Sequence, residues 1–251
     1  MRIDAFYGTT GMTPNDTTGR VIVIIDVLRA STSIAVALAN DARAVIPFDS
    51  TDDVVTRAKA FDRSEVRLAG ERQMRPIPGF DLGNSPREFT REAVEGKTVL
   101  MTTTNGTAAI GTVQGARDVV IASYVNFSAV SAMLRAALRG GTDICIVCAG
   151  REKQFSLEDA ACAGRYVHQI SRRLSGVELN DAALAAMLID RRYADNILRL
   201  FSASAHGRAL SEAGFGEDLT MCAAIDSYPV IPLFQDRQIT KLGPPPERVR
   251  S

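Results

Sequence analysis

The first group of residues that could do chemistry follows an apolar run at Val21–Ile25. Asp26 ends this run, and Arg29, Ser31 and Thr32 come soon after it. A carboxylate at the end of a buried strand lies at the mouth of a crevice, and the free amide groups of a helix that starts there attract an anion. This combination is typical of metal-assisted phosphate chemistry. The simpler interpretation, in which Asp26 only caps the helix and pairs with Arg29, does not require the two hydroxyls.

A second group lies farther along the chain, where acidic and amide side chains surround a segment rich in proline and glycine. Glu71 and Arg72 follow an apolar run, and Asp81, Asn84 and Ser85 lie within the segment. Glu71 and Asp81 carry oxygen atoms that suit a hard cation. Asn84 and Ser85 are expected either to bind a substrate oxyanion or to cap the helix that follows, and the sequence leaves both possibilities open.

A third group is rich in threonine. Thr103, Thr104, Asn105, Gly106 and Thr107 follow one another at the end of an apolar run. Hydroxyls and free amide groups at a strand end, leading into a helix, resemble a cradle for an oxyanion. A tight Asn-Gly turn with a threonine cap would explain two of these residues but not the others.

The fourth group is the acidic pair Glu158 and Asp159 at the start of a long helical segment. Two acids there complement the helix dipole, which is the simpler interpretation. The functional interpretation makes one of them a metal ligand or the residue that orients the attacking water. The two histidines, His168 and His206, have neither a serine-hydrolase motif nor a zinc-type partner, so both are expected to be structural.

These groups are positioned by apolar runs typical of buried strands, which alternate with segments of helical spacing. The strands are expected at Val21–Asp26, Ala42–Phe48, Val66–Gly70, Lys97–Thr102, Arg117–Ala122 and Asp143–Cys148, with short ones at Val230–Phe234 and near Gln238–Leu242. The helices are expected at Ala30–Asn40, Ser50–Phe61, Gly106–Thr112, Ser128–Leu138 and Glu158–Leu174, and through most of 180–215. The alternation predicts a three-layer α/β/α fold with a mainly parallel or mixed sheet. We expect one domain, 1–251, with its active site at the carboxyl ends of the strands.

The amino-acid composition limits the classes of partner and the location that we expect. The 251 residues include 29 Lys and Arg against 29 Asp and Glu, so the net charge is 29 − 29 = 0, which gives no reason to expect a nucleic acid or a membrane. The first residues lack the apolar segment of a secretory signal, so the expected location is cytoplasmic. Cys145 and Cys148 lie in a strand pattern that sends them to opposite faces, so we expect free thiols.

The ordered set of motifs resembles the 2-phosphosulfolactate phosphatase family, magnesium-dependent acid phosphatases associated with coenzyme M biosynthesis. The segments that carry the resemblance span about residues 20 to 235: Asp26-Val-Leu-Arg29-Ala-Ser31-Thr32, Gly70-Glu71-Arg72, Gly79–Pro86, Thr103–Thr107, Val147–Gly150, Leu157–Asp159, the His206-Gly207-x-x-Leu210-x-x-x-Gly214 pattern and Asp218. Family members usually have a glycine near position 74, where this chain has Gln73-Met74-Arg75.

The resemblance implies a phosphatase with Mg²⁺ as cofactor that hydrolyses a small anionic phosphate ester, such as 2-phospho-3-sulfolactate, to the hydroxy acid and phosphate. We expect Asp26, Glu71 and Asp81 to bind the metal and Arg29 to hold the phosphate. The remaining predicted site residues contact the substrate or orient water: Ser31, Thr32, Arg72, Asn84, Ser85, Thr103, Thr104, Asn105, Gly106, Thr107, Glu158 and Asp159.

Several alternatives stay open at this stage. One is a non-catalytic binding protein for anionic metabolites, and another is a phosphatase or phosphotransferase for a different phosphate monoester. The sequence does not decide between covalent attack by Asp26 and direct attack by water. It also leaves open whether the helices of 180–215 cover the sheet or a partner subunit in a homo-oligomer.

Overall fold

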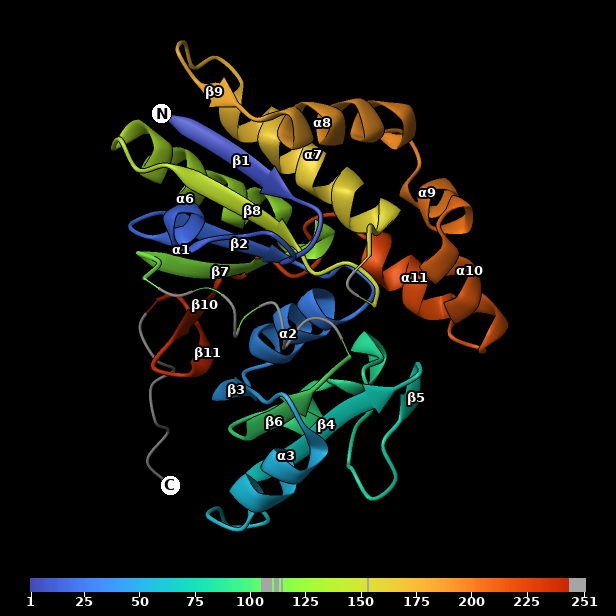
Figure 1. The fold of residues 1–251 in the computed structure, drawn as a ribbon. Helices are drawn as coiled ribbons and strands as arrows, with labels where there is room; N and C mark the ends of the chain where they lie inside the picture. The colour runs from blue at the N-terminus through green and yellow to red at the C-terminus, as the bar shows by residue number, and fades with distance from the viewer. Residues whose placement is uncertain (105–109, 111–112, 114, 153, 244–251) are drawn as a thin grey trace.

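The computed structural model describes residues 1–104, 110, 113, 115–152 and 154–243 (Figure 1). Its strands are β1 (Arg2–Phe6), β2 (Val21–Ile25), β3 (Ala44–Pro47), β4 (Val66–Arg72), β5 (Arg75–Pro76), β6 (Thr98–Thr102), β7 (Asp118–Ala122), β8 (Ile144–Cys148), β9 (Glu178–Leu179), β10 (Pro232–Gln235) and β11 (Gln238–Lys241). Its α-helices are α1 (Pro14–Thr17), α2 (Ala30–Ala39), α3 (Thr51–Ala58), α4 (Arg91–Val94), α6 (Phe127–Arg139), α7 (Leu157–Ser171), α8 (Asp181–Tyr193), α9 (Ile197–Ala203), α10 (Ala205–Glu212) and α11 (Gly216–Ala223), and two 3₁₀ helices are η1 (Pro86–Glu88) and η2 (Tyr124–Asn126).

The strands form a mixed sheet in the order β5-β4-β6-β3-β11-β10-β7-β2-β8-β1-β9. The strands β4, β6 and β3 pair in parallel, and so do β7, β2, β8, β1 and β9. The β10–β11 hairpin joins the two groups, because β10 pairs antiparallel with β7 and β11 pairs antiparallel with β3. The expected α/β class with a mainly parallel or mixed sheet is therefore confirmed.

Helices cover both faces of each group of strands. Helix α2 lies between the groups and packs on side chains from both, among them Ile22 and Val99 (Figure 1). Helices α6 and α7 pack on the opposite face of the β2 group, and Val54 of α3 packs on the opposite face of the β4 group. The expected α/β/α layering thus occurs twice, with α2 shared. The side chains of Cys145 and Cys148 lie on opposite faces of β8. Both are buried free thiols, as expected.

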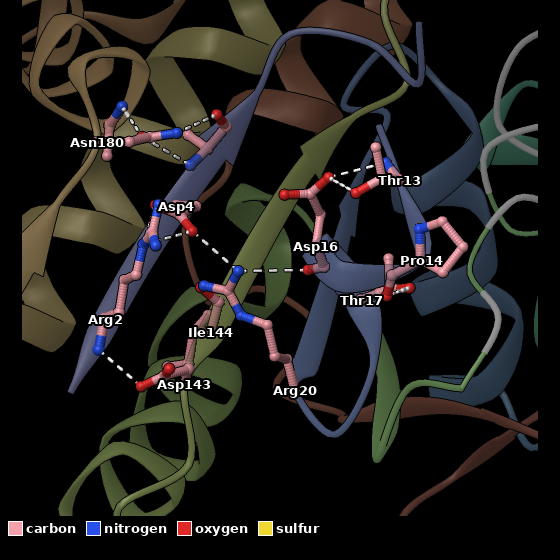
Figure 2. Close-up of polar contacts among 12 residues, drawn as sticks. Arg2, Asp4, Thr13, Pro14, Asp16, Thr17, Arg20, Asp143, Ile144 and Asn180 are labelled. Atoms are coloured by element: carbon pink, nitrogen blue, oxygen red, sulfur yellow. Dashed lines mark hydrogen bonds and ion pairs between the residues drawn. The ribbon is translucent and has the colours of Figure 1, made fainter. Parts of the chain in front are cut away.

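Strand β1 was not expected, because a charged residue interrupts its short apolar pattern. Asp4 is 1% exposed and accepts hydrogen bonds from Arg20 at 2.8 Å and from Arg2 at 3.0 Å (Figure 2). Arg20 also donates to the carbonyl oxygen of Ile144 in β8. The ion pair compensates the cost of burying the carboxylate, so β1 can occupy an interior position in the sheet.

The helices of 180–215 pack against one another and against the rest of the chain. Helix α8 packs against α7 and β1, with Ala183 and Ala186 fully buried, although Leu188 stays 63% exposed on its outer side. No helix in the described ranges is long and apolar enough to cross a membrane.

Gly164 sets the distance between α7 and α8. A methyl group added to Gly164 would lie 2.0 Å from the carbonyl oxygen of Ala186, and the α8 backbone cannot move aside as a side chain could. We expect Gly164→Ala to lower the free energy of unfolding by about 1–3 kcal/mol in urea titrations. Gly216→Ala is the control, because nothing lies within 4 Å of the added methyl and its stability should match or exceed that of wild type. Equal stability of the two variants would contradict the close helix contact.

Candidate active site

A cavity of about 470 Å³ opens where strands from both parallel groups end. Its walls come from the ends of β2, β4, β6 and β8, from the β4–β5 hairpin and from α10. The residues that line it are Asp26, Leu28, Arg29, Glu71, Arg72, Gln73, Met74, Asn84, Thr103, Thr104, Arg151, Glu152 and His206. The β10–β11 hairpin joins the two groups and α2 packs on both, and the cavity lies at the carboxyl ends of their strands, as the rule for α/β sheets predicts.

Asp26 follows β2 at the base of the cavity and is 6% exposed. Its amide donates to the hydroxyl of Ser31, and the amide of Ala30 lies 3.4 Å from its carboxylate, so the start of α2 fixes its position. Burial raises the pKa of Asp26 to about 6; His206 and the Ala30 amide oppose the increase, whereas Glu71 and Glu158 add to it. The site therefore holds a carboxylate that gains from a nearby cation.

Glu71 lies in β4 and is 7% exposed. One carboxylate oxygen accepts hydrogen bonds from the amide and the hydroxyl of Thr104, at 2.9 and 2.8 Å. The other accepts from the amide of Met74 at 2.9 Å. A carboxylate has about four lone-pair sites, so these three bonds fix its orientation and still leave capacity for a cation.

Asn84 contributes an oxygen that has no partner. The side chain is 5% exposed and lines the cavity, and its Oδ1 atom is buried without a hydrogen-bond donor in the described part of the chain. A buried acceptor in this state is costly unless a ligand satisfies it. This observation favours the binding interpretation of Asn84. Ser85 differs, because its hydroxyl donates to Asp218 at 2.6 Å.

The β4–β5 hairpin is tight, and its turn residues have unusual backbone conformations. Gln73 and Met74 connect the paired residues Arg72 and Arg75, with φ angles of 51° and 68°. Positive φ at both central positions is the geometry of a type I′ turn, which favours glycine or asparagine. The glycine that the resemblance led us to expect near position 74 would suit this geometry. Here two hydrogen bonds hold Met74. Its amide donates to Glu71, and its carbonyl oxygen accepts from Arg29.

Three arginines contribute positive charge to the cavity. Arg29 is 3% exposed, forms an ion pair with Asp218 at 2.8 Å and lies over the ring of Phe215. Arg72, at the end of β4, donates to the Thr102 hydroxyl at 3.0 Å. The guanidinium group of Arg151 makes no hydrogen bond or ion pair with the residues that the structure describes. Of the three arginines, Arg151 is therefore the one whose guanidinium group is least held by the described residues.

The two acids at the start of α7 lie behind the cavity wall. Glu158 is 2% exposed, and its Oε1 lies 3.3 Å from Nδ1 of His206, which lines the cavity. Burial by itself would raise the pKa of Glu158, but the hydrogen bond and charge of His206 outweigh it and lower that pKa. Asp159 accepts from the amides of Val27 and Gly150 and so anchors the segments after β2 and β8. Burial is the main cause that raises the pKa of Asp159, and the negative charges of Asp26 and Glu158 raise it further.

Some predicted site residues do not line the cavity. The hydroxyl of Thr32 donates to the Val27 carbonyl, and the Ser31 hydroxyl accepts from Asp26, so both stabilise the turn around Asp26. Asp81 accepts from the Leu68 amide and forms an ion pair with Arg63, outside the cavity. The structure therefore does not bring Asp81 to Asp26 and Glu71. Thr103 and Thr104 line the cavity, whereas Asn105, Gly106 and Thr107 lie outside the described residues.

The structure also adds residues that had no predicted role in the site. His206, expected to be structural, lines the cavity, and Asp218 pairs with Arg29. Arg151, Glu152, Gln73 and Met74 complete the wall. The sequence signal for them was weak: His206 and Asp218 lie within the C-terminal motif that resembles the family, but no pattern linked that motif to Asp26.

The donor atoms of the site suit a hard cation. The carboxylates of Asp26 and Glu71 and the unpartnered Oδ1 of Asn84 are all oxygens, as Mg²⁺ prefers. Within the described ranges, no cluster of three His, Cys, Asp or Glu side chains has metal-binding geometry. Mg²⁺ often binds one or two carboxylates and completes its shell with water and substrate phosphate, so the residues present fit it.

Comparison with known proteins identifies the family. A family model for 2-phosphosulpholactate phosphatase matches residues 8–237. The chain belongs to the 2-phosphosulfolactate phosphatase family. It is 42% identical over 224 residues to a probable 2-phosphosulfolactate phosphatase of Symbiobacterium thermophilum. The aligned region covers 89% of this chain and 95% of that protein. A protein of the same description in Clostridium botulinum strain Alaska E43 is 34% identical over 242 residues, covering 96% of this chain and 100% of that protein.

Membership of the 2-phosphosulfolactate phosphatase family confirms the enzyme class expected from the motifs, a phosphoric monoester hydrolase. The match begins after β1 and extends over β2 to β10 and over α7, α10 and α11, so it includes every element that lines the cavity.

Proposed function

We propose that the chain is a Mg²⁺-dependent phosphatase that hydrolyses 2-phospho-3-sulfolactate to the hydroxy acid and phosphate. The observation that carries this proposal is the pair of buried carboxylates, Asp26 and Glu71, in one cavity with the unpartnered oxygen of Asn84. The names of the two relatives, both probable 2-phosphosulfolactate phosphatases, supply the substrate. A small ester with several negative charges also matches a cavity that contains both acids and arginines.

In this proposal Asp26, Glu71 and Asn84 would hold Mg²⁺, and the bound cation would supply positive charge that offsets the negative charge of the phosphate. The three hydrogen bonds to Glu71 keep its carboxylate in place, so little reorganisation is needed when the substrate binds. Thr103 and Thr104 supply polar groups beside the phosphate. Both line the cavity immediately after β6.

Arg72 and Arg151 lie on the cavity wall, where they suit the carboxylate and sulfonate of the substrate. Arginine forms bidentate hydrogen bonds with such planar or multi-oxygen anions. Arg29 has a second task, because its contacts with Asp218 and Met74 hold α11 and the β4–β5 hairpin against the start of α2. It therefore contributes charge to the phosphate and rigidity to the wall.

The direct test is phosphate release from 2-phosphosulfolactate by the purified full chain, with Mg²⁺ and after chelation by EDTA. We expect removal of the metal to lower turnover by at least about 100-fold, because a bound cation contributes several kcal/mol to charge stabilisation. Added Mg²⁺ should restore the activity. Full turnover in EDTA would reject the metal site.

A panel of phosphate monoesters and isothermal titration calorimetry separate the alternatives. A higher kcat/KM for another ester would assign a different substrate. Tight metal-independent binding of 2-phosphosulfolactate without turnover of any ester would instead identify a binding protein.

A further inference from the structure

His206 combines exposure to the cavity with a buried carboxylate behind it. Its side chain is 14% exposed and lines the same cavity as Asp26, while Glu158 on its other side is 2% exposed. Nδ1 of His206 lies 3.3 Å from Oε1 of Glu158, so the carboxylate contacts this nitrogen and Nε2 is the other ring nitrogen of the side chain that lines the cavity. A carboxylate accepts a hydrogen bond only from a nitrogen that carries hydrogen, so Glu158 orients the ring with hydrogen on Nδ1, and in the imidazolium form Nε2 carries hydrogen as well and can donate it.

The local fold holds this histidine rigidly. His206 is the second residue of α10, whose first turn is capped by the Ser204 hydroxyl, which accepts from the Gly207 amide at 3.0 Å. A methyl group on Gly207 would lie 2.0 Å from the carbonyl oxygen of Phe201, so glycine at this position permits the close contact of α10 with α9. The His206-Gly207 pair therefore places an imidazole at the cavity wall and keeps it there.

Hydrolysis of an alkyl phosphate requires a proton donor for the leaving oxygen. The leaving oxygen of a 2-hydroxy acid is an alkoxide, which departs slowly unless it is protonated. The arginines in the wall do not release protons, and the carboxylates of Asp26 and Glu71 have the metal-binding role proposed above. Imidazole is the side chain that most often performs general acid catalysis.

We propose that His206 is the catalytic residue that protonates the leaving oxygen and that Glu158 is its positioning residue; this inference rests on the proposed phosphatase function. The bond between phosphorus and the alkyl oxygen breaks, its electron pair stays on that oxygen, and the oxygen takes the proton of Nε2 to form the hydroxyl of the product. The oxygen of the attacking water forms the new bond to phosphorus. The proton that this water releases returns to His206 through solvent, so the products are the hydroxy acid and hydrogen phosphate.

The test compares leaving groups. We expect His206→Gln to lower kcat for 2-phosphosulfolactate by about 100- to 10,000-fold, the range for loss of a general acid. The same variant should lose less than about fivefold on 4-nitrophenyl phosphate, whose phenolate leaves without a proton. Glu158→Gln should show the same pattern with a smaller loss. His168→Gln is the matched control, because His168 is exposed on α7 and should leave both rates unchanged.

Equal losses on the two substrates, or no loss on 2-phosphosulfolactate, would overturn the role of His206. If wild type does not hydrolyse the aryl ester, His206→Ala with added imidazole decides: partial recovery supports the proton donor and no recovery rejects it. Unfolding curves in urea show whether each variant is folded. A wild-type chain that hydrolyses no phosphate ester would instead overturn the proposed function itself, and this inference with it.

Discussion

Asp26→Asn is expected to stop phosphate release and, at the same time, to stabilise the metal-free protein above pH 6. The pKa of Asp26 is raised to about 6 by burial, whereas an unfolded aspartate titrates near 3.8. Between these values the folded state binds more protons than the unfolded state, so stability falls as the pH rises toward 6. Above pH 6 the buried charge costs on the order of 2–3 kcal/mol, and asparagine removes this cost. Mg²⁺ should offset the same cost in wild type.

The measurement is urea unfolding of both proteins at pH 4 and pH 8 in EDTA, with phosphate release measured separately in Mg²⁺. The stability difference should be present at pH 8 and much smaller at pH 4. Asp81→Asn is the control, because Asp81 pairs with Arg63 outside the cavity and should leave turnover within about twofold. A loss of turnover in Asp81→Asn equal to that in Asp26→Asn would show that Asp81 belongs to the metal site.

Asp218→Ala is expected to lower the free energy of unfolding by about 3–5 kcal/mol, because it leaves the charge of Arg29 buried without a partner. Arg29 and Asp218 are 3% and 1% exposed, and the lost carboxylate also accepts the hydroxyl of Ser85. Denaturant unfolding measures the change.

The double variant Arg29→Met with Asp218→Leu should recover much of the loss, since apolar side chains can replace a buried ion pair. The adjacent Glu217 supplies a control on the same helix: it pairs with Arg87 at the surface, with 74% of its side chain exposed. Glu217→Ala should change stability by less than about 0.5 kcal/mol. If Asp218→Ala is equally mild, Arg29 has another source of stabilisation.

The contrast between Asp26 and Glu71, which share the cavity, and Asp81, which lies outside it, shows why the site was only partly predictable. Asp26 and Glu71 both end or follow apolar strands, and strand ends meet in an α/β sheet, so the sequence correctly predicts that they share a cavity. Asp81 has the same chemistry but lies in a loop, and no periodicity fixes the direction of a loop side chain. The nearby Arg63 and the Leu68 amide determine its position.

The C-terminal part contains residues whose contacts with the site could not be predicted from the sequence. His206 and Asp218 are polar residues on helices, and a helix pattern predicts which face is buried but not which strand end that face meets. Packing of α10 and α11 against the rest of the chain places His206 beside Glu158 and Asp218 beside Arg29. Pairs separated by 48 and 189 positions leave no local signal in a single sequence.

The sequence by itself determined the α/β class, most strands and helices, and the meeting of Asp26 and Glu71 at the strand ends, whereas their roles in the site stay predictions. These properties follow from local apolar patterns and from residue type. The tertiary structure decided which polar residues meet: it joined two parallel groups of strands through the β10–β11 hairpin, buried Asp4 of β1 against Arg20, and placed His206 in the cavity wall. The physical reason is that contacts between distant segments depend on how whole helices and sheets pack, and this packing is a property of the folded chain.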